Sequence, residues 1–389
     1  MKHRCMCLVC GSSRLSPPVI RLEEIPSCCN VLWDTQPEAM SQPTAAMSLT
    51  LCSQCGHLFN ADFDQELVDY RPGYENSLRG SERFREYDVK LVEELIEGYG
   101  LRGRTVVEIG CGRSEFLRTL CRSGNNRGIG YDPSYPGDES EIPETEDIRI
   151  FPERYESHPR DLEVDLVCSR QTLEHVEDPE NFLRSIRSSI RRLGIPVFFE
   201  VPNALFTLRD GGIWDLIHEH CSYFTPQSLK KAFELGGYHS IEITETFEGQ
   251  YLTAHAKTGF SDFPEEAVGI DYLERLAANF ADRYWTEIER WNLKLRDFDR
   301  RKRKVVVWGG GSKGITFLNV LRPRSVEFIV DVNTLKHAKY IPGTGQQIVT
   351  PDFMKEYRPD VIIGMNPNYR EEMTRHVSAL GVQAEFLWA

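Results

Sequence analysis

One short segment of the chain concentrates titratable side chains. His218 and His220 stand on either side of Glu219, and the aromatic residues Tyr223 and Phe224 follow. An imidazole titrates near neutral pH, so it can take a proton from an acidic carbon or a hydroxyl group, and a neighbouring carboxylate can orient it. In an extended segment both histidines would face the same cleft; otherwise the chain turns irregularly. The pattern predicts general-base chemistry, with a zinc site or a hydrogen-bonded surface loop as alternatives.

The first of two glycine-rich turns follows an apolar strand that contains an acid. Glycine lets the backbone approach a ligand there, and the next helix presents its N-terminus to an electron-rich group. Glu108 in the strand, the turn, and Asp132 after the next strand resemble motifs I and II of class I S-adenosylmethionine (SAM) methyltransferases. The resemblance implies that the turn lies against the methionine part of SAM and that Asp132 binds the ribose hydroxyls. The predicted cofactor-binding residues are Glu108, Gly110, Cys111, Gly112, Asp132 and Ser169.

The second glycine-rich turn has no acid in its strand. Gly309, Gly311 and Gly314 fit a G-x-G-x-x-G pattern, and Asp331 falls where a ribose-binding acid would stand. A nicotinamide site is therefore one interpretation of this turn. However, no redox-active group of residues follows it in the sequence.

Two Cys-x-x-Cys pairs, each followed by glycine, stand near the start of the chain. The predicted metal ligands are Cys7, Cys10, Cys52 and Cys55. Four thiolates at this spacing suit one tetrahedral zinc ion, and such a closed site leaves no open position for catalysis. The segment has few apolar residues, so the metal would supply much of its folding free energy. Because the chain shows no secretion signal, its 11 cysteines favour metal binding or free thiols over a disulfide framework.

The elements that must position these residues follow an α/β pattern. Strand and helix patterns alternate after residue 105 and again after residue 304, which predicts two doubly wound sheets with helices on both faces. Before about Asp62 there is little strand or helix periodicity, and a polar segment with helical spacing joins the two α/β parts. The predicted domains are a zinc-binding domain at 1–66, a class I SAM methyltransferase domain at 67–259, a helical linker at 260–303 and a C-terminal Rossmann-like domain at 304–389.

Composition limits the classes of function. The net charge of −13 opposes nucleic-acid binding, and the one basic run, at 300–304, is interpreted as a solvated linker. No apolar run approaches the roughly 20 residues of a membrane span, so we expect no membrane partner. The start of the chain lacks the apolar part of a signal peptide, so we expect a cytoplasmic protein. The oligomeric state is not predicted.

Several motifs together resemble one specific family. These are the two cysteine pairs, the Glu-x-Gly-Cys-Gly turn, His218-Glu219-His220-x-x-Tyr223-Phe224 and Trp308-Gly309-x-Gly311-x-Lys313-Gly314. In this order they resemble the SAM-dependent sugar C-methyltransferases, over nearly the whole chain. Members of that family methylate C3 of nucleotide-linked 4-keto deoxysugars after deprotonation next to the ketone. The resemblance implies a small-molecule substrate, a nucleotide-activated sugar.

The resemblance also implies roles for single residues. His220 would be the general base, Glu219 its orienting carboxylate, and Tyr74 a hydrogen-bond donor to the enolate oxygen. His175 would face the sugar, with packing at a helix start as the alternative. The C-terminal domain would close over the substrate and bring Lys313 near its phosphates.

Two other functions stay open at this stage. Ile217 stands where the sugar enzymes often have a tyrosine, which keeps methyl transfer to oxygen or nitrogen of another small metabolite as an alternative. A nicotinamide-binding reductase or nucleotide-binding module, built on the second glycine turn, is the third hypothesis.

Overall fold

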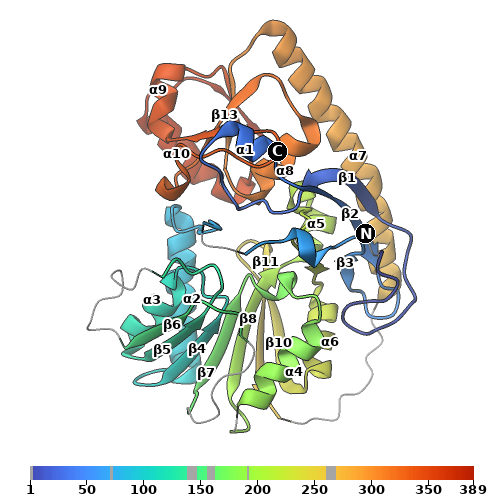
Figure 1. Ribbon diagram of the computed structural model, residues 1–389, viewed down its shortest axis with the longest axis vertical. Helices are drawn as coiled ribbons and strands as arrows, with labels where there is room; N and C mark the ends of the chain where they lie inside the picture. Colours follow the sequence, from blue (N-terminus) through green and yellow to red (C-terminus); the bar gives the residue numbers. More distant parts are fainter. Residues whose placement is uncertain (1–2, 71–72, 138–146, 156–162, 191, 260–268) are drawn as a thin grey trace.

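A computed structural model describes most of the 389-residue chain and shows three β-sheets (Figure 1). The described residues are 3–70, 73–137, 147–155, 163–190, 192–259 and 269–389. Among them, no helix is both long and apolar enough to cross a membrane.

The central sheet has seven strands in the order β10-β11-β8-β7-β4-β5-β6. The strands are β4 (Thr105–Ile109), β5 (Arg127–Tyr131), β6 (Ile148–Phe151), β7 (Leu166–Arg170), β8 (Pro196–Pro202), β10 (Tyr238–Thr246) and β11 (Tyr251–Thr258). β4 lies between β5 and β7, so its carboxyl end marks the point where the strand order reverses, which is where open α/β sheets bind ligands. The predicted Rossmann-like core is confirmed.

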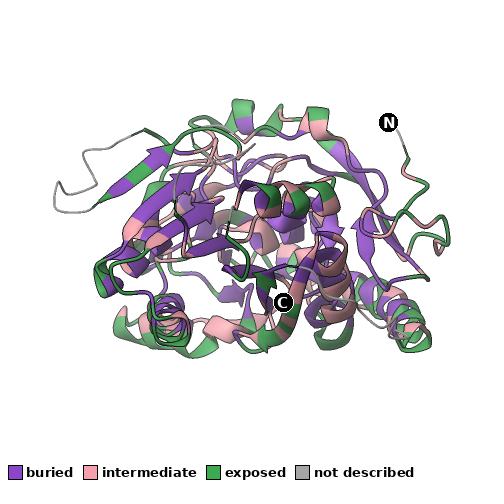
Figure 2. Cartoon of the chain, turned by 90° about the horizontal axis from the view of Figure 1, so that it is seen from below, coloured by how far each residue is buried: buried purple, intermediate pink, exposed green. Residues whose placement is uncertain are grey.

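Helices cover both faces of this sheet. They are α2 (Glu82–Tyr99), α3 (Glu115–Gly124), α4 (Pro179–Ser189) and α6 (Pro226–Leu235). Neighbouring residues of β4 point to opposite faces: Val106 packs with the residues of α2 and α3, whereas Val107 packs with those of α4 and α6. Both faces are therefore buried, as the purple strands of Figure 2 show, which explains why the adjacent positions 106 and 107 of β4 are both apolar.

The prediction of a wholly parallel central sheet was wrong in one part. β11 runs antiparallel to β8 and to β10, so the two strands extend one edge of the sheet. Neither strand was predicted; β10 is partly exposed and rich in polar residues, whereas six of the eight residues of β11 are buried.

The N-terminal segment forms a small antiparallel sheet that was not predicted. Its order is β1-β2-β3-β9, from β1 (Ile20–Pro26), β2 (Thr44–Leu51), β3 (Leu58–Asn60) and β9 (Ser222–Tyr223). Seven of the eight residues of β2 are buried, and the apolar and polar alternation from Met47 to Leu51 is a strand signal that the prediction missed. β9 comes from the methyltransferase segment, so this sheet joins the two predicted domains.

The C-terminal part is a five-stranded parallel sheet in the order β14-β13-β12-β15-β16. Its elements are β12 (Val305–Trp308), α8 (Ser312–Leu321), β13 (Val326–Val330), β14 (Gln347–Val349), α9 (Met354–Tyr357), β15 (Val361–Gly364), α10 (Arg370–Ala379) and β16 (Glu385–Trp388). This confirms the second predicted Rossmann-like unit. The second glycine turn follows β12, which again lies where the strand order reverses.

Three further helices connect these parts. They are α1 (Gln36–Met40), α5 (Ala204–Asp210) and α7 (Ile270–Arg301), the last confirming most of the predicted linker helix. Figure 1 places α1 against the C-terminal domain, and Gln36 Nε2 donates to the carbonyl oxygen of Gly345 over 3.0 Å. The N-terminal segment therefore contacts both α/β units.

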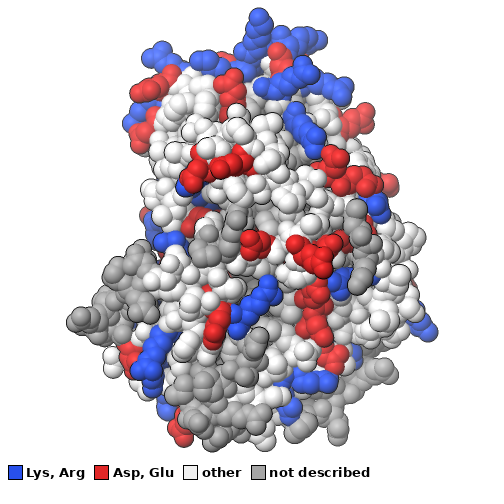
Figure 3. Space-filling view, viewed as in Figure 1, with Lys and Arg blue, Asp and Glu red and all other residues white. Residues whose placement is uncertain are grey.

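The basic run at 300–304, which spans the end of α7, is largely exposed, as the interpretation of a solvated linker requires. Arg301 pairs with Asp297 at 2.9 Å and Arg303 with Glu385 at 2.6 Å. Figure 3 shows basic side chains gathered at the upper end of the molecule, with acidic side chains among them. The run is thus partly neutralised by its own neighbours.

Candidate active site

A cavity of about 520 Å³ lies at the carboxyl ends of the central strands. Gly110, Cys111, Gly112 and Asp132 line it, as predicted for a cofactor site. The backbone N–H of Gly112 donates to Oδ2 of Asp132 over 2.7 Å, which ties the turn to the acid after β5. No heavy atom lies within 4 Å of the position that a Cβ would take at Gly112, so the space above the turn is open. This arrangement fits SAM in position and in size.

Glu108 and Ser169 do not line this cavity, contrary to their predicted role. The carboxyl of Glu108 is 2% exposed, and burial raises its pKa to about 8. The hydroxyl of Ser169 donates to the carbonyl oxygen of Ile109 over 2.8 Å and so links β7 to β4. Ser169 thus holds the strand end that precedes the turn, and the carboxyl of Glu108 is buried beneath the sheet surface, with its Oε2 unpartnered among the described residues.

A substitution at Gly110 should distinguish the role of the turn in SAM binding from an effect on the stability of the fold. Gly110 has φ of +73°, and a Cβ there would overlap the hydroxyl of Thr172. Gly110→Ala is therefore expected to weaken SAM binding at least tenfold, measured by calorimetry. Gly103→Ala is the matched control, because Gly103 has φ of +63° but no atom within 4 Å of the added carbon. Equal SAM affinity in the two variants would contradict the assignment.

A second cavity of about 250 Å³ lies next to the first. Tyr74, Gln171 and His175 belong to the walls of both cavities, whereas His220 lines only the second. Two predicted catalytic residues thus lie between the cofactor space and the second cavity. The position of Gln171, which no motif indicated, is set by the turn after β7.

His175 and His220 lie against each other, with ring centroids 4.8 Å apart. Nδ1 of His175 lies 3.0 Å from the carbonyl oxygen of Glu219 and 2.7 Å from the hydroxyl of Tyr70. Loss of water contact lowers the pKa of His175 to about 4. Loss of water contact, together with the charges of His175 and Lys313, holds the pKa of His220 well below 6.5. Both rings are therefore neutral at pH 7, and a neutral imidazole can accept a proton.

The carboxylate of Glu219 does not orient His220, contrary to the prediction. Its Oε1 accepts a hydrogen bond from Tyr74 over 3.3 Å, and its Oε2 has no partner among the described residues. Asn30 donates to the hydroxyl oxygen of Tyr74 over 3.3 Å. Burial raises the pKa of Glu219 to about 7 and that of Tyr74 well above 10. Glu219 therefore positions Tyr74 with its side chain and His175 with its carbonyl group.

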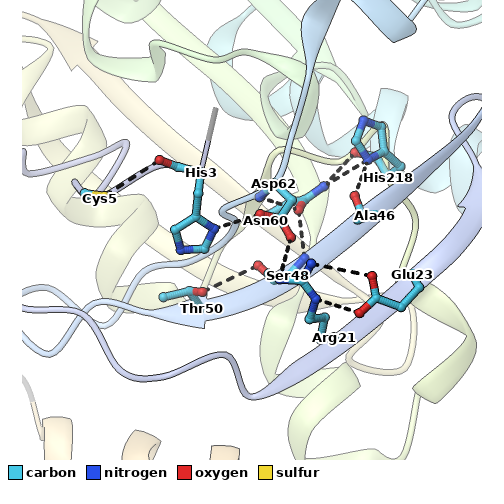
Figure 4. A network of polar contacts seen from close by, with 10 residues as sticks. All are labelled: His3, Cys5, Arg21, Glu23, Ala46, Ser48, Thr50, Asn60, Asp62 and His218. Atoms are coloured by element: carbon cyan, nitrogen blue, oxygen red, sulfur yellow. Dashed lines mark hydrogen bonds and ion pairs between the residues drawn. The ribbon is translucent and has the colours of Figure 1, made fainter. Parts of the chain in front are cut away.

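His218 points toward Ala46 and Asn60 of the N-terminal sheet (Figure 4), whereas His220 lines the second cavity. Its Nδ1 is 2.9 Å from the carbonyl oxygen of Ala46, and Asn60 donates to the carbonyl oxygen of His218 over 3.2 Å. Its ring stacks on Phe63, with centroids 5.5 Å apart. Of the two possibilities that the sequence left open, the irregular turn is the one found. His218 therefore joins its segment to the N-terminal sheet, and of the two histidines only His220 lines the second cavity.

The four predicted zinc ligands converge. Sγ of Cys7 lies 3.6 Å from that of Cys55, and Sγ of Cys10 lies 3.7 Å from that of Cys52. Sulfur atoms around tetrahedral zinc, with bonds of about 2.3 Å, stand roughly 3.8 Å apart. The donor set therefore fits zinc in both geometry and chemistry. Cys5, Cys28 and Cys29 lie outside this group.

The second glycine turn faces the second cavity. Gly309, Gly311 and Lys313 line it, and Lys313 forms an ion pair with Asp215, another wall residue. Asp331 also lines the cavity, but its Oδ2 accepts from the N–H of Gly310 over 2.7 Å. The sequence predicted the turn and the position of Lys313. It did not indicate Asp215, whose place in the wall depends on contact between domains.

Buried Lys336 is a further residue of this wall that no sequence motif indicated. Its ammonium group donates to the carbonyl oxygen of Gly310 over 3.1 Å, and the side chain is 3% exposed. With Lys313 it gives the turn two cations. Positive charge and an uncapped helix start are features of anion-binding sites.

Comparison with known proteins agrees with this geometry. Residues 80–243 match the family described as methyltransferase domain, and residues 261–387 match the C-methyltransferase C-terminal domain. The chain is 25% identical over 392 residues to the C-methyltransferase NovU of Streptomyces niveus, which covers 94% of this chain and 90% of NovU.

Solved structures of methyltransferases resemble part of the chain. For the 1,6-didemethyltoxoflavin-N1-methyltransferase of Burkholderia thailandensis the TM-score is 0.37 with 16% identity, covering 46% of this chain and 83% of that one. For a putative SAM-dependent methyltransferase of Listeria monocytogenes the TM-score is 0.36 with 12% identity, covering 45% and 99%.

Proposed function

We propose that this protein, a SAM-dependent methyltransferase, methylates a carbon atom next to the carbonyl group of a nucleotide-linked keto-sugar. The observation that carries the proposal is the position of His220. Its neutral imidazole lies in the wall of a cavity that adjoins the cofactor space and reaches the second glycine turn. The similarity to a C-methyltransferase over 94% of the chain supports transfer to carbon.

The proposed reaction divides the work among three side chains. His220 takes the proton from the carbon next to the carbonyl group, which leaves an enolate whose negative charge lies largely on oxygen. The hydroxyl proton of Tyr74, which Glu219 accepts in this structure, would turn to that oxygen, while Asn30 continues to donate to the hydroxyl oxygen of Tyr74. SAM, when bound, supplies the electrophilic methyl group. Such positioning and charge stabilisation are the main sources of rate in reactions of this kind.

The second glycine turn would bind the phosphates of the substrate. α8 starts at Gly311 without a side-chain cap, so its first N–H groups are available to an anion. Lys313 and Lys336 add positive charge beside it. Asp215 would release Lys313 when the phosphates enter.

This role predicts a specific kinetic effect of Lys313. Lys313→Met is expected to raise the KM for a nucleotide-linked keto-sugar about tenfold or more, because a charge-assisted contact is lost. The dissociation constant of SAM should not change. Lys339→Met is the matched control, because Lys339 pairs with exposed Asp34 outside both cavities. An unchanged KM in Lys313→Met would contradict the proposal that this turn binds the phosphates of the substrate.

Transfer to oxygen or nitrogen is the second candidate function. Ile217 lines the second cavity and offers no hydrogen bond to a sugar ring from its side chain. Incubation with SAM and 4-keto sugar nucleotides, followed by NMR of the product, decides between them. A new methyl signal coupled to the ring carbons supports C-methylation, and an O-methyl or N-methyl signal contradicts it.

The structural zinc ion and the place of action are part of the proposal. The converging sulfur atoms support one zinc ion that holds the N-terminal segment. A cytoplasmic location is supported by the cysteines, which a reducing compartment would keep as thiols.

A further inference from the structure

A second group of metal-ligating side chains lies beside the second cavity. Glu174 and His175 occupy the 3₁₀ turn after β7, and His220 lies in the segment before β9. One ligand atom from each of the three residues lies within 4.8 Å of the other two. Two imidazoles and one carboxylate form a donor set that suits divalent transition metals.

The contacts of Nδ1 of His175 favour the tautomer that can bind a metal through Nε2. A carbonyl oxygen can only accept a hydrogen bond, so a proton on Nδ1 satisfies the carbonyl oxygen of Glu219 at 3.0 Å, and the hydroxyl of Tyr70 at 2.7 Å can accept from the same N–H. The lone pair is then on Nε2. Histidines that bind metals in proteins usually donate their other N–H to a backbone carbonyl or a carboxylate in this way.

Glu174 supplies the independent observation. Its side chain is 1% exposed, and its Oε2 has no hydrogen-bond partner among the described residues. A buried carboxylate oxygen without a donor is costly, and a bound cation would satisfy it. Glu174 and His220 both belong to the wall of the second cavity, so an ion held there would keep open positions toward that cavity.

We propose that Glu174, His175 and His220 form a second metal site, which takes a divalent transition-metal ion such as Zn²⁺ or Co²⁺. The ion would bind through the lone pair that His220 needs as a base, so the occupied enzyme would not deprotonate its substrate. Metal binding at this site goes beyond the proposed function and does not depend on it. Only the inhibitory consequence rests on the base role of His220.

The binding test uses the full-length protein with zinc already in the four-cysteine site. Titration with Co²⁺ should show one further equivalent of bound metal, with d–d absorption bands. A thiolate-to-cobalt charge-transfer band should be absent, because such a band would mean that Co²⁺ had replaced zinc at the cysteines. Glu174→Gln and His175→Gln should each weaken this binding at least tenfold. His239→Gln, on β10, is the matched control. No further equivalent, or equal binding in the Glu174 and His175 variants, would overturn the site.

Two measurements keep the result interpretable. Thermal unfolding establishes that each variant is folded, and SAM calorimetry adds a second check for Glu174→Gln, because Glu174 does not line the first cavity. Zn²⁺ should inhibit methyl transfer over the concentration range in which it fills the site, and a chelator too weak to empty the cysteine site should reverse this. Methyl transfer that rises with the metal would overturn the inhibitory role. A different methyl acceptor would contradict the proposed function but leave the Co²⁺ bands unchanged.

Discussion

Replacing His220 by alanine is expected to stop the exchange of the substrate's acidic C–H proton with deuterium and to lower methyl transfer by about 10²–10⁴-fold, the usual contribution of a general base. Of the four predicted catalytic residues, Tyr74 and His175 line both cavities and Glu219 lines neither. His220 lines the second cavity, which reaches the second glycine turn, and not the first. Proton exchange is the decisive measurement because it reports deprotonation without the methyl-transfer step. SAM binding should stay close to that of the unchanged protein, because His220 does not line the first cavity.

His218→Gln is the matched control for this experiment. The two histidines stand two residues apart, but His218 contacts Ala46 and Asn60 of the N-terminal sheet. Its replacement should lower stability and leave proton exchange in the folded protein within a few-fold of normal. Exchange at the normal rate in His220→Ala would mean that another group is the base. Equal losses in both variants would mean that the segment acts through its structure alone.

Loss of zinc is expected to have the second large effect. Cys52→Ser should reduce the bound zinc to well below one ion per chain, and the N-terminal segment should unfold, because structural zinc sites contribute about 10–16 kcal/mol of apparent binding free energy. β3 begins three residues after Cys55 and pairs with β9, through Leu58 and Tyr223. Since His220 lies two residues before the start of β9, methyl transfer should fall more than about 10²-fold.

SAM binding should decline less than methyl transfer in this variant. The cofactor turn is built on β4 in the middle of the central sheet, whereas the zinc site contacts that domain near α6, where Thr225 donates to the carbonyl oxygen of Gly56 over 3.2 Å. Cys5→Ser is the matched control, because Cys5 is exposed and outside the ligand group. Zinc content, thermal unfolding and activity are measured on both variants. A Cys52→Ser protein that keeps its zinc and its activity would contradict the prediction.

Long-range pairing explains why the N-terminal sheet was not predicted. β2 is buried along nearly its whole length because β1 and β3 flank it and other elements cover it. The alternation from Met47 to Leu51 indicates a strand, but it does not identify the strands with which β2 pairs. The pairing of β3 with β9 joins residues more than 160 positions apart in the sequence, and no local pattern encodes such a partner.

The side chains of Glu219 and of the two histidines point in directions that the sequence did not predict, and the cause is related. The sequence suggested that Glu219 would orient His220, since the two residues are adjacent. In the folded protein the chain turns irregularly, so the carboxylate of Glu219 bonds to Tyr74 while its carbonyl oxygen contacts His175. Adjacent residues share a backbone but not a side-chain direction, and that direction depends on packing from other elements.

By itself, the sequence determined the local devices of this protein: the cofactor turn at 110–112, the second turn at 309–314, the paired cysteines and the two Rossmann-like units. The turns and the cysteine pairs are each encoded within a few residues, because a positive φ, a helix N-terminus or a Cys-x-x-Cys spacing constrains only its own segment. The two Rossmann-like units follow from repeated alternation of strand and helix patterns. Only the tertiary structure decided that His220 faces the cavity, that Lys313 lies across from it, and that Glu174 joins the two histidines. These contacts between residues of separate elements depend on how the elements pack, and local sequence spacing does not specify that packing.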